Sequence, residues 1–179
     1  MAWKTLEQTT LIDEYHVSVQ KNRVQLPQGD IIDDFYIVTI PDAVIIAALT
    51  DEGTILLKRE YRYACGCDVI ECPSGMVEKT DVDLLFAAKR ELKEETGYES
   101  DTWTYLGPSF ESTSKLTNRA HLFLAEHAVK TSGLHLDEHE YLTVMEVSLA
   151  DACAMVMTGE INANSTAHLI LKAARLSGV

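Results

Sequence analysis

Three glutamates, Glu91, Glu94 and Glu95, have the residue type and spacing best suited to chemistry in this sequence. Positions i, i+3 and i+4 project from one face of an α-helix, so a helix would gather three carboxylates that repel one another. A hard divalent ion such as Mg²⁺ prefers carboxylate oxygens and completes its coordination with water and substrate phosphates. With Arg90 beside them, the glutamates favour a metal site for a diphosphate. Spacing alone leaves one alternative open, a solvated acidic face balanced by neighbouring basic residues.

The segment 83–96, DLLFAAKRELKEET, predicts the helix that would hold these carboxylates. Its leucines and alanines recur at helical spacing and form an apolar stripe. Asp81 or Asp83 can cap the start of the helix, and Gly97 stands where a C-terminal cap belongs. A helix with both ends marked in this way fixes the positions of the glutamates relative to one another.

The sequence before this helix is typical of β-structure. Residues 13–40 alternate weakly between apolar and polar side chains and are broken by turn residues at 21–22 and 28–30, which predicts a small antiparallel meander. Residues 43–49 and 54–60 predict two further strands, and the tight turn between them predicts that the two strands pair as a hairpin.

After the helix, strands are expected at 102–107, 120–127 and 141–147, followed by helices at 149–158 and 164–175. Strands and helices are therefore mixed without a regular β-α-β alternation. This order favours an α+β fold over a doubly wound parallel sheet.

Composition and charge narrow the class of protein. A chain of 179 residues has the length of one domain, or of one domain with a small appendage. Its net charge of −13 disfavours nucleic-acid binding, although it permits a polyphosphate whose charge a metal ion neutralises. The longest apolar run, 43–49, is too short for a membrane span, and the N-terminal MAWKTLEQTT has no signal-peptide character. We therefore expect a cytoplasmic protein with no membrane partner, whose four cysteines are small buried thiols.

The sequence around the helix carries a recognisable motif. Residues 90–98 read R-E-L-K-E-E-T-G-Y, and Gly75 precedes the helix by a short loop. This pattern resembles the Nudix box, in which Gly and Glu are followed by Arg-Glu-apolar-any-Glu-Glu-any-Gly-apolar. The second half matches at every fixed position. In the first half the loop is one residue longer than the box prescribes, and its glutamate is replaced by Asp81 or missing.

Further segments resemble one branch of that family, the ADP-ribose pyrophosphatases. K-R-E-Y-R-Y at 58–63 and V-I-E-C-P-S-G-M-V-E at 69–78 match motifs of this branch. The resemblance implies an α+β fold, with a Nudix-type α/β/α sandwich and mixed sheet at 41–179. It also implies a small N-terminal antiparallel β meander at 1–40, through which the chain forms a homodimer.

The same resemblance implies roles for individual residues. Glu138, in the acidic turn D-E-H-E-Y, would orient or deprotonate the attacking water, and Mg²⁺ or Mn²⁺ would be the cofactor. Its ligands would be carboxylates of the helix and of that turn with one main-chain carbonyl: Glu91, Glu94, Glu95, Glu140 and the carbonyl of Ser74. A different assignment within the turn, including Asp137, stays open, as does a turn that is merely solvated.

Residues for the substrate are expected outside the box. Arg62 would meet a phosphate or pair with a neighbouring carboxylate, and Phe35 and Tyr36 would stack on a nucleobase or belong to the core. The predicted activity is Mg²⁺-dependent hydrolysis of a nucleoside diphosphate sugar, foremost ADP-ribose, to AMP and ribose 5-phosphate. The alternatives are a hydrolase of GDP-mannose or another nucleotide sugar, and a Nudix-like module that binds such a ligand without cleaving it.

Overall fold

The computed structural model describes residues 2–136, 138–139 and 141–179, and these residues form two compact units. One unit contains the residues up to Asp42 together with Phe110–Arg119. The other contains Ala43–Ser109 and Ala120–Val179. The segment Phe110–Arg119 joins the first unit through its backbone, because the N–H of Val38 donates to the carbonyl of Lys115 at 2.8 Å.

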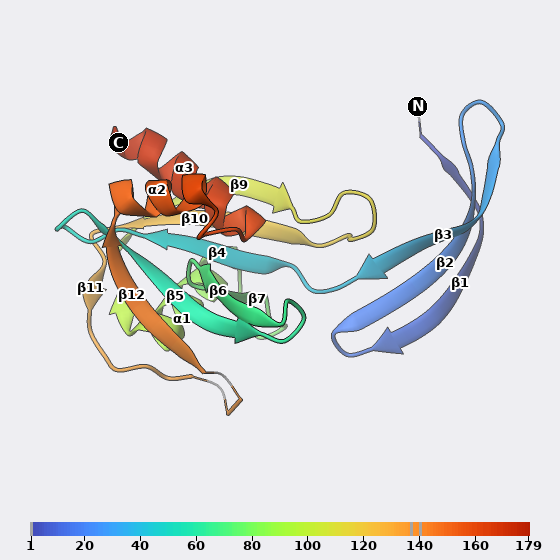
Figure 1. Ribbon diagram of the computed structural model, residues 1–179. Coiled ribbons are helices and arrows are strands. Elements are labelled where there is room, and N and C mark those ends of the chain that lie inside the picture. The colour runs from blue at the N-terminus through green and yellow to red at the C-terminus, as the bar shows by residue number, and fades with distance from the viewer. Residues whose placement is uncertain (1, 137, 140) are drawn as a thin grey trace. The chain divides into compact units, whose positions relative to one another are not determined.

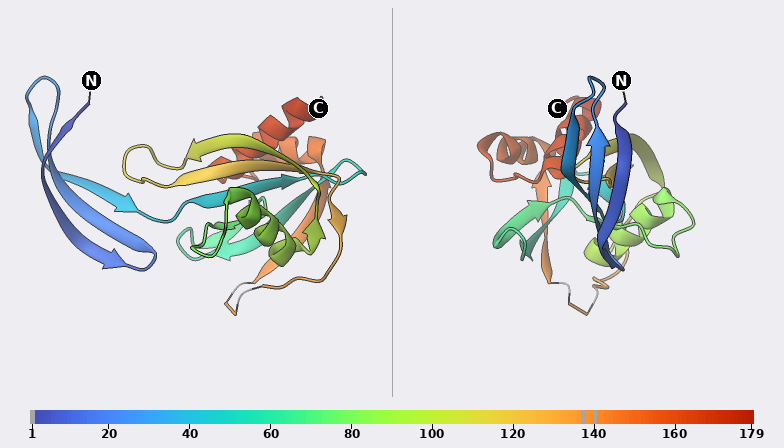
Figure 2. Two further views of the ribbon diagram at one scale, coloured as in Figure 1. Left: turned by 180° about the vertical axis from the view of Figure 1, so that it is seen from behind. Right: turned by 90° about the vertical axis from the view of Figure 1, so that its right-hand side faces the viewer.

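The N-terminal unit is an antiparallel meander, as predicted. Its strands β1 (Lys4–Glu14), β2 (Val17–Gln25) and β3 (Ile31–Thr39) pair in the order β1-β2-β3, and Figure 2 shows these three long strands side by side. Strand β1 was not predicted, since the alternation of its residues is too weak to mark it.

The predicted break at 21–22 is wrong, because β2 runs through it. The register of β2 against β3 shifts between Asn22 and Val24, so the irregularity is absorbed as a bulge. Both of these side chains are buried. A bulge keeps the strand paired on either side, and turn-forming residues there do not end it.

The second unit has a mixed sheet at its centre. Strand β4 (Ala43–Ala48) lies between β10 (Arg119–Glu126), to which it is parallel, and β7 (Ser74–Met76), to which it is antiparallel. Strand β9 (Thr102–Phe110) completes the order β7-β4-β10-β9. Strands β8 (Tyr98–Glu99) and β11 (Val129–Lys130) form a short antiparallel pair.

A second sheet is antiparallel and has the order β12-β5-β6. It consists of β5 (Thr54–Arg62), β6 (Cys67–Glu71) and β12 (Leu142–Ser148). The predicted hairpin of 43–49 with 54–60 is wrong beyond its turn, because β4 and β5 belong to different sheets. At the turn itself an antiparallel bridge joins Leu49 to Ile55, and the N–H of Thr50 donates to the carbonyl of Thr54 at 3.0 Å. Strand β4 is apolar and buried along almost its whole length, whereas β5 is buried only from Ile55 to Lys58. Strand β5 pairs with its neighbour in sequence, β6, and with the distant β12.

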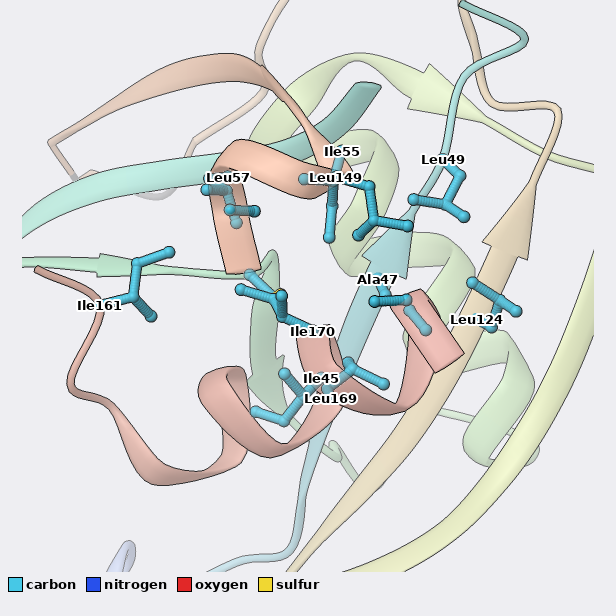
Figure 3. Packing of buried hydrophobic residues seen from close by; sticks show 14 of the residues in the cluster. Ile45, Ala47, Leu49, Ile55, Leu57, Leu124, Leu149, Ile161, Leu169 and Ile170 are labelled. Atoms are coloured by element: carbon cyan, nitrogen blue, oxygen red, sulfur yellow. The ribbon is translucent and has the colours of Figure 1, made fainter. Parts of the chain in front are cut away.

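Helices cover both sides of β4. Val44, Ile46 and Ala48 belong to a buried cluster with the apolar side chains of α1 (Leu84–Thr96). The alternate residues of β4 pack with α2 (Leu149–Thr158) and α3 (Asn164–Ser177), in the cluster shown in Figure 3. Figure 1 shows these helices on the side of β4 opposite to α1. Fully burying one such aliphatic side chain stabilises the fold by about 1.5–3 kcal/mol.

These layers confirm the predicted α/β/α sandwich with a mixed sheet. Cys72 is buried as expected, but the expectation is wrong for Cys65, which is exposed in the turn between β5 and β6, and for Cys67, which is exposed at the start of β6. None of the helices in the described part of the chain has the length and apolar character needed to cross a membrane.

Candidate active site

Helix α1 is fixed at both ends, so the positions of its glutamates are set by local chemistry. Asp83 is the N-cap, and its carboxylate accepts a hydrogen bond from the backbone N–H of Phe86 at 2.7 Å. Gly97 ends the helix in the left-handed conformation with φ of 74°, and its N–H donates to the carbonyl of Lys93 at 2.9 Å. Of the two predicted caps, Asp83 is therefore the one used.

A cavity of about 330 Å³ lies beside this helix. The structure brings four of the predicted site residues together around it, from β5, β7 and α1: Arg62, Ser74, Glu91 and Glu94. Lys58, Arg90 and His135 also line the cavity. Glu95, only 1% exposed, is bonded to Ser74 in the cavity wall. The predicted carboxylate face therefore borders a space that a small anionic substrate can enter.

Gly75 has no side chain, and the carboxylate of Glu91 occupies the space that a Cβ atom would need. A Cβ atom at position 75 would lie 2.1 Å from both Cδ and Oε1 of Glu91. Van der Waals contact requires more than 3 Å, so a larger residue cannot coexist with Glu91 as it stands. The glycine of the motif is needed here for space beside the helix.

Lys58 is the most deeply buried cation in the described part of the site, with 1% of its surface exposed. Its ammonium donates to the carbonyl of Ser74 at 3.3 Å and to the carboxylate of Glu95, and lies 3.5 Å from Oε2 of Glu60. The other oxygen of Glu95 accepts the backbone N–H of Ser74 at 2.8 Å. Strands β5 and β7 and helix α1 thus meet at one charged cluster.

Arg90 forms a second cluster on the same helix. Its guanidinium binds both carboxylate oxygens of Asp81 at 3.0 and 3.1 Å, and donates to Glu91 at 2.8 Å and Glu94 at 3.1 Å. It also donates to the carbonyl of Met76 at 3.1 Å. One arginine therefore ties the loop before the helix to two of the three glutamates.

Arg62 is held by carboxylates while it faces the cavity. It donates to Glu71 at 2.7 Å and to Glu60 at 2.9 Å. Burial lowers the pKa of Arg62, but the attraction of Glu71 and Glu60 outweighs it and raises this pKa overall. Of the two roles predicted for Arg62, pairing with a carboxylate is observed, and its place in the cavity wall leaves phosphate binding possible as well.

Burial changes the acidity of the helix glutamates. It raises the pKa of Glu91 to about 7 and that of Glu95 to about 8, although Arg90 and Lys58 respectively act in the opposite direction. Asp81 behaves differently, because its hydrogen bonds with Arg90 lower its pKa. A divalent cation bound beside these two carboxylates would lower both pKa values, because it favours their deprotonated forms.

The donor set fits a hard divalent cation. It offers carboxylate oxygens and one main-chain carbonyl, and Gly75 leaves room for Glu91 beside that carbonyl. Among the residues that the structure describes, no group of three or more His, Cys, Asp or Glu side chains is gathered at one point as for a metal ion. The cations of Lys58 and Arg90 lie between the carboxylates instead.

Comparison with known proteins agrees with the fold. The family model for the NUDIX domain matches residues 39–169. The chain belongs to the Nudix family. Hydrolases of the Nudix family generally use a divalent metal, in keeping with the oxygen donors beside α1.

Several Nudix relatives extend over nearly the whole chain. It is 35% identical to an ADP-ribose pyrophosphatase of Bacillus subtilis (strain 168), in an alignment covering 93% of this chain and 92% of the relative. It is 30% identical to a methanol dehydrogenase activator of Bacillus methanolicus, covering 91% and 88% of the two chains. It is 29% identical to a GDP-mannose pyrophosphatase of Yersinia enterocolitica, covering 99% and 91%.

A solved structure, described as the crystal structure of an ADP compounds hydrolase, has the same fold. Its TM-score is 0.81 at 20% sequence identity, and the alignment covers 99% of this chain and 97% of that chain. The similarity extends over both units of the chain and agrees with the predicted fold class.

The Nudix box lies on β7, the following loop and α1. The loop is longer than the family pattern by one residue, and Asp81 stands near the place of the expected glutamate. Because Asp81 binds Arg90 in a two-point contact, this departure anchors the loop to the helix.

The structure does not assign the remaining predicted site residues to this cavity. Glu138 is exposed in a turn, and Glu140, like Asp137, lies outside the described residues. Phe35 and Tyr36 belong to the N-terminal unit, where the ring of Phe35 packs on Trp3 with 5.5 Å between ring centroids. These four acidic and aromatic assignments stay predictions.

Among the unpredicted residues of the cavity wall are two basic ones, Lys58 and His135. Lys58 follows three apolar residues in its strand and shares a face with Leu56, and this signal could have marked it as a buried cation. His135 lines the cavity, and its backbone N–H donates to the carbonyl of Glu94 at 2.8 Å. It lies in an irregular segment, which offers no periodicity from which to infer its position.

Proposed function

We propose that this Nudix enzyme hydrolyses the diphosphate bond of a nucleoside diphosphate sugar, with ADP-ribose as substrate and AMP and ribose 5-phosphate as products. One observation carries the proposal: the buried carboxylates of the Nudix helix border the cavity that also holds Arg62. The 35% identity to an ADP-ribose pyrophosphatase over 93% of the chain supports the choice of substrate.

The proposed cofactor is Mg²⁺, with Mn²⁺ as a substitute. The residues that would hold it are those with oxygen donors in the box and the acidic turn: Glu91, Glu94, Glu95, Glu140 and the carbonyl of Ser74. When bound, such an ion neutralises phosphate oxygens and acidifies coordinated water.

The chain's own residues supply the rest of the mechanism. Arg62 binds the diphosphate through N–H groups that its bonds to Glu60 and Glu71 hold in place. Glu138 takes the proton from the water that attacks phosphorus, and positioning of that water in line with the leaving oxygen does most of the catalytic work. Phe35 and Tyr36 stack on the nucleobase.

GDP-mannose is the second candidate substrate. The observation that favours it is the 29% identity to a GDP-mannose pyrophosphatase over 99% of this chain. The segment 111–119, which departs from the branch that the sequence resembles, carries Arg119 where an acid is common in that branch. The carboxylate chemistry is the same for both substrates, so base and sugar preference are decided outside the Nudix box.

We also propose that the chain is a homodimer through the meander at 1–40, with the Nudix domain at 41–179. The meander leaves large apolar side chains exposed: Trp3, Leu11, Ile12, Tyr15, Ile31 and Tyr36. Large apolar side chains exposed in this number favour an interface. Free thiols at the four cysteines support a cytoplasmic location, and the net charge of −13 disfavours partnership with nucleic acids or anionic membranes.

A product screen tests the proposed function. The purified chain with Mg²⁺ is offered ADP-ribose, GDP-mannose, UDP-glucose, a dinucleotide polyphosphate and a nucleoside triphosphate, and products are separated by chromatography. We expect AMP from ADP-ribose, faster than any other product. Faster release of GMP from GDP-mannose would make GDP-mannose the preferred substrate instead of ADP-ribose. Tight binding without turnover of any compound would refute the proposal that the chain is an enzyme.

A further inference from the structure

The ammonium of Lys58 stands in a place suited to a metal ion. It lies among oxygens from three elements: the carbonyl of Ser74 on β7, the carboxylate of Glu95 on α1 and that of Glu60 on its own strand. Lys58 and Glu95 are each only 1% exposed, so this cation and its main partner are both withdrawn from solvent. A main-chain carbonyl and carboxylates are the donors that a hard divalent ion prefers.

A second cation cannot share this position. Two positive charges a few ångströms apart in a buried site repel one another strongly, because little solvent screens them. Both oxygens of Glu95 are also engaged, since one binds Lys58 and the other accepts the N–H of Ser74. Metal binding at Ser74 and Glu95 therefore requires that the ammonium move away.

We propose that Lys58 is a built-in counter-ion, which occupies a cation position of the site until a divalent ion displaces its ammonium. The inference rests on the proposed function, because it takes Ser74 and Glu95 as metal ligands. Lys58 keeps the buried carboxylate of Glu95 paired in the metal-free protein, where an unpaired charge would be costly. The same pairing weakens metal binding, since the ion must break it.

The affinity for Mn²⁺ tests this role. We would measure free Mn²⁺ by electron paramagnetic resonance in titrations of the wild type, Lys58→Met and Lys93→Met. Met has a similar length without the charge. Lys93 is the control because it is an exposed lysine of helix α1, the helix that carries Glu95, and it pairs with Glu99 at 2.9 Å. We expect the Kd to fall at least tenfold in Lys58→Met and to stay within twofold in Lys93→Met.

An unchanged or weaker Mn²⁺ affinity in Lys58→Met would overturn the proposal. A lysine that only supports the fold would give that result, because loosening the site weakens metal binding. If Lys58→Met does not fold, Lys58→Gln serves instead, since its amide can still donate hydrogen bonds to the carboxylates without carrying the charge.

Chemical labelling of Lys58 gives an independent measurement on the wild type. We expect slow acetylation of this buried amine without metal and faster acetylation at saturating Mn²⁺, as read by mass spectrometry. Unchanged acetylation with bound Mn²⁺ would overturn the displacement. If the wild type binds no Mn²⁺ at all, the proposed metal site itself fails, so the two failures are distinguishable.

Discussion

Substitution of Gly75 by alanine should damage the site through one contact. The new Cβ would lie 2.1 Å from Cδ and Oε1 of Glu91, whereas real Cβ contacts are almost never shorter than 3.0 Å. The carboxylate must therefore retreat by about 0.9 Å, the difference between these two distances. The displaced atoms are the end of a flexible side chain, so the cost in stability should lie at the low end for overpacking, about 1 kcal/mol. A misplacement near 1 Å in a catalytic site lowers turnover by about 100-fold.

The assay combines thermal unfolding, followed by circular dichroism, with the rate of AMP release from ADP-ribose. Gly133→Ala is the matched control, because a Cβ at position 133 meets nothing within 4 Å and the backbone there is not left-handed. We expect Gly75→Ala to unfold several degrees lower and to lose about 100-fold in kcat, while Gly133→Ala keeps both values close to wild type.

A double mutant separates the clash from any other effect at position 75. In a Glu91→Ala background the obstructing atoms are gone, so Gly75→Ala should cost less than about 0.5 kcal/mol of stability. The reasoning is refuted if Gly75→Ala has wild-type stability and turnover, or if it costs as much without the Glu91 side chain as with it.

Three further predictions concern stability and reactivity. Asp81→Asn should lower the free energy of unfolding by at most about 1 kcal/mol at pH 7, since the pair of Asp81 with Arg90 is partly screened. Because the folded-state pKa of Asp81 is depressed, the difference in stability from wild type should shrink as the pH falls below about 4. A difference that stays constant in urea titrations at several pH values would count against the pairing. Burial raises the pKa of Cys72 to about 12, so at pH 8 a thiol reagent should label Cys65 and Cys67 quickly and Cys72 only on unfolding; early labelling of Cys72, seen by peptide mass spectrometry, would contradict its burial. Leu92→Ala removes a fully buried side chain from the core beside the Nudix helix and should destabilise the fold by about 2–5 kcal/mol in urea titration, with a loss under 1 kcal/mol as the contrary result.

The parts of the fold that local chemistry determines could be predicted from the sequence. Helix α1 follows from apolar spacing, and capping residues within a few positions of one another restrict its N-cap to Asp81 or Asp83. The carboxylate face follows from the same spacing, because Glu91, Glu94 and Glu95 share a helix face whatever packs around them.

Strand pairing could not be predicted in the same way. Strand β4 is apolar on both faces, so nothing in its own residues distinguishes a hairpin with β5 from a separate sheet with distant partners. Strand β2 contains turn-forming residues that a bulge accommodates at Asn22, and only its neighbours reveal this. Lys58 is a buried cation because the completed fold places Ser74 of β7 and Glu95 of α1 beside its ammonium, and the residues around Lys58 in the sequence do not show this.

The dependence of ADP-ribose turnover on Mg²⁺ tests the central claim most directly. We would titrate Mg²⁺ at fixed ADP-ribose and compare the wild type with Glu95→Gln and with Glu99→Gln, an exposed glutamate outside the cavity that pairs with Lys93. The account predicts saturable Mg²⁺-dependent release of AMP in the wild type and Glu99→Gln, and a loss of at least 100-fold in Glu95→Gln. Equal turnover in all three proteins, or turnover without any divalent ion, would contradict it.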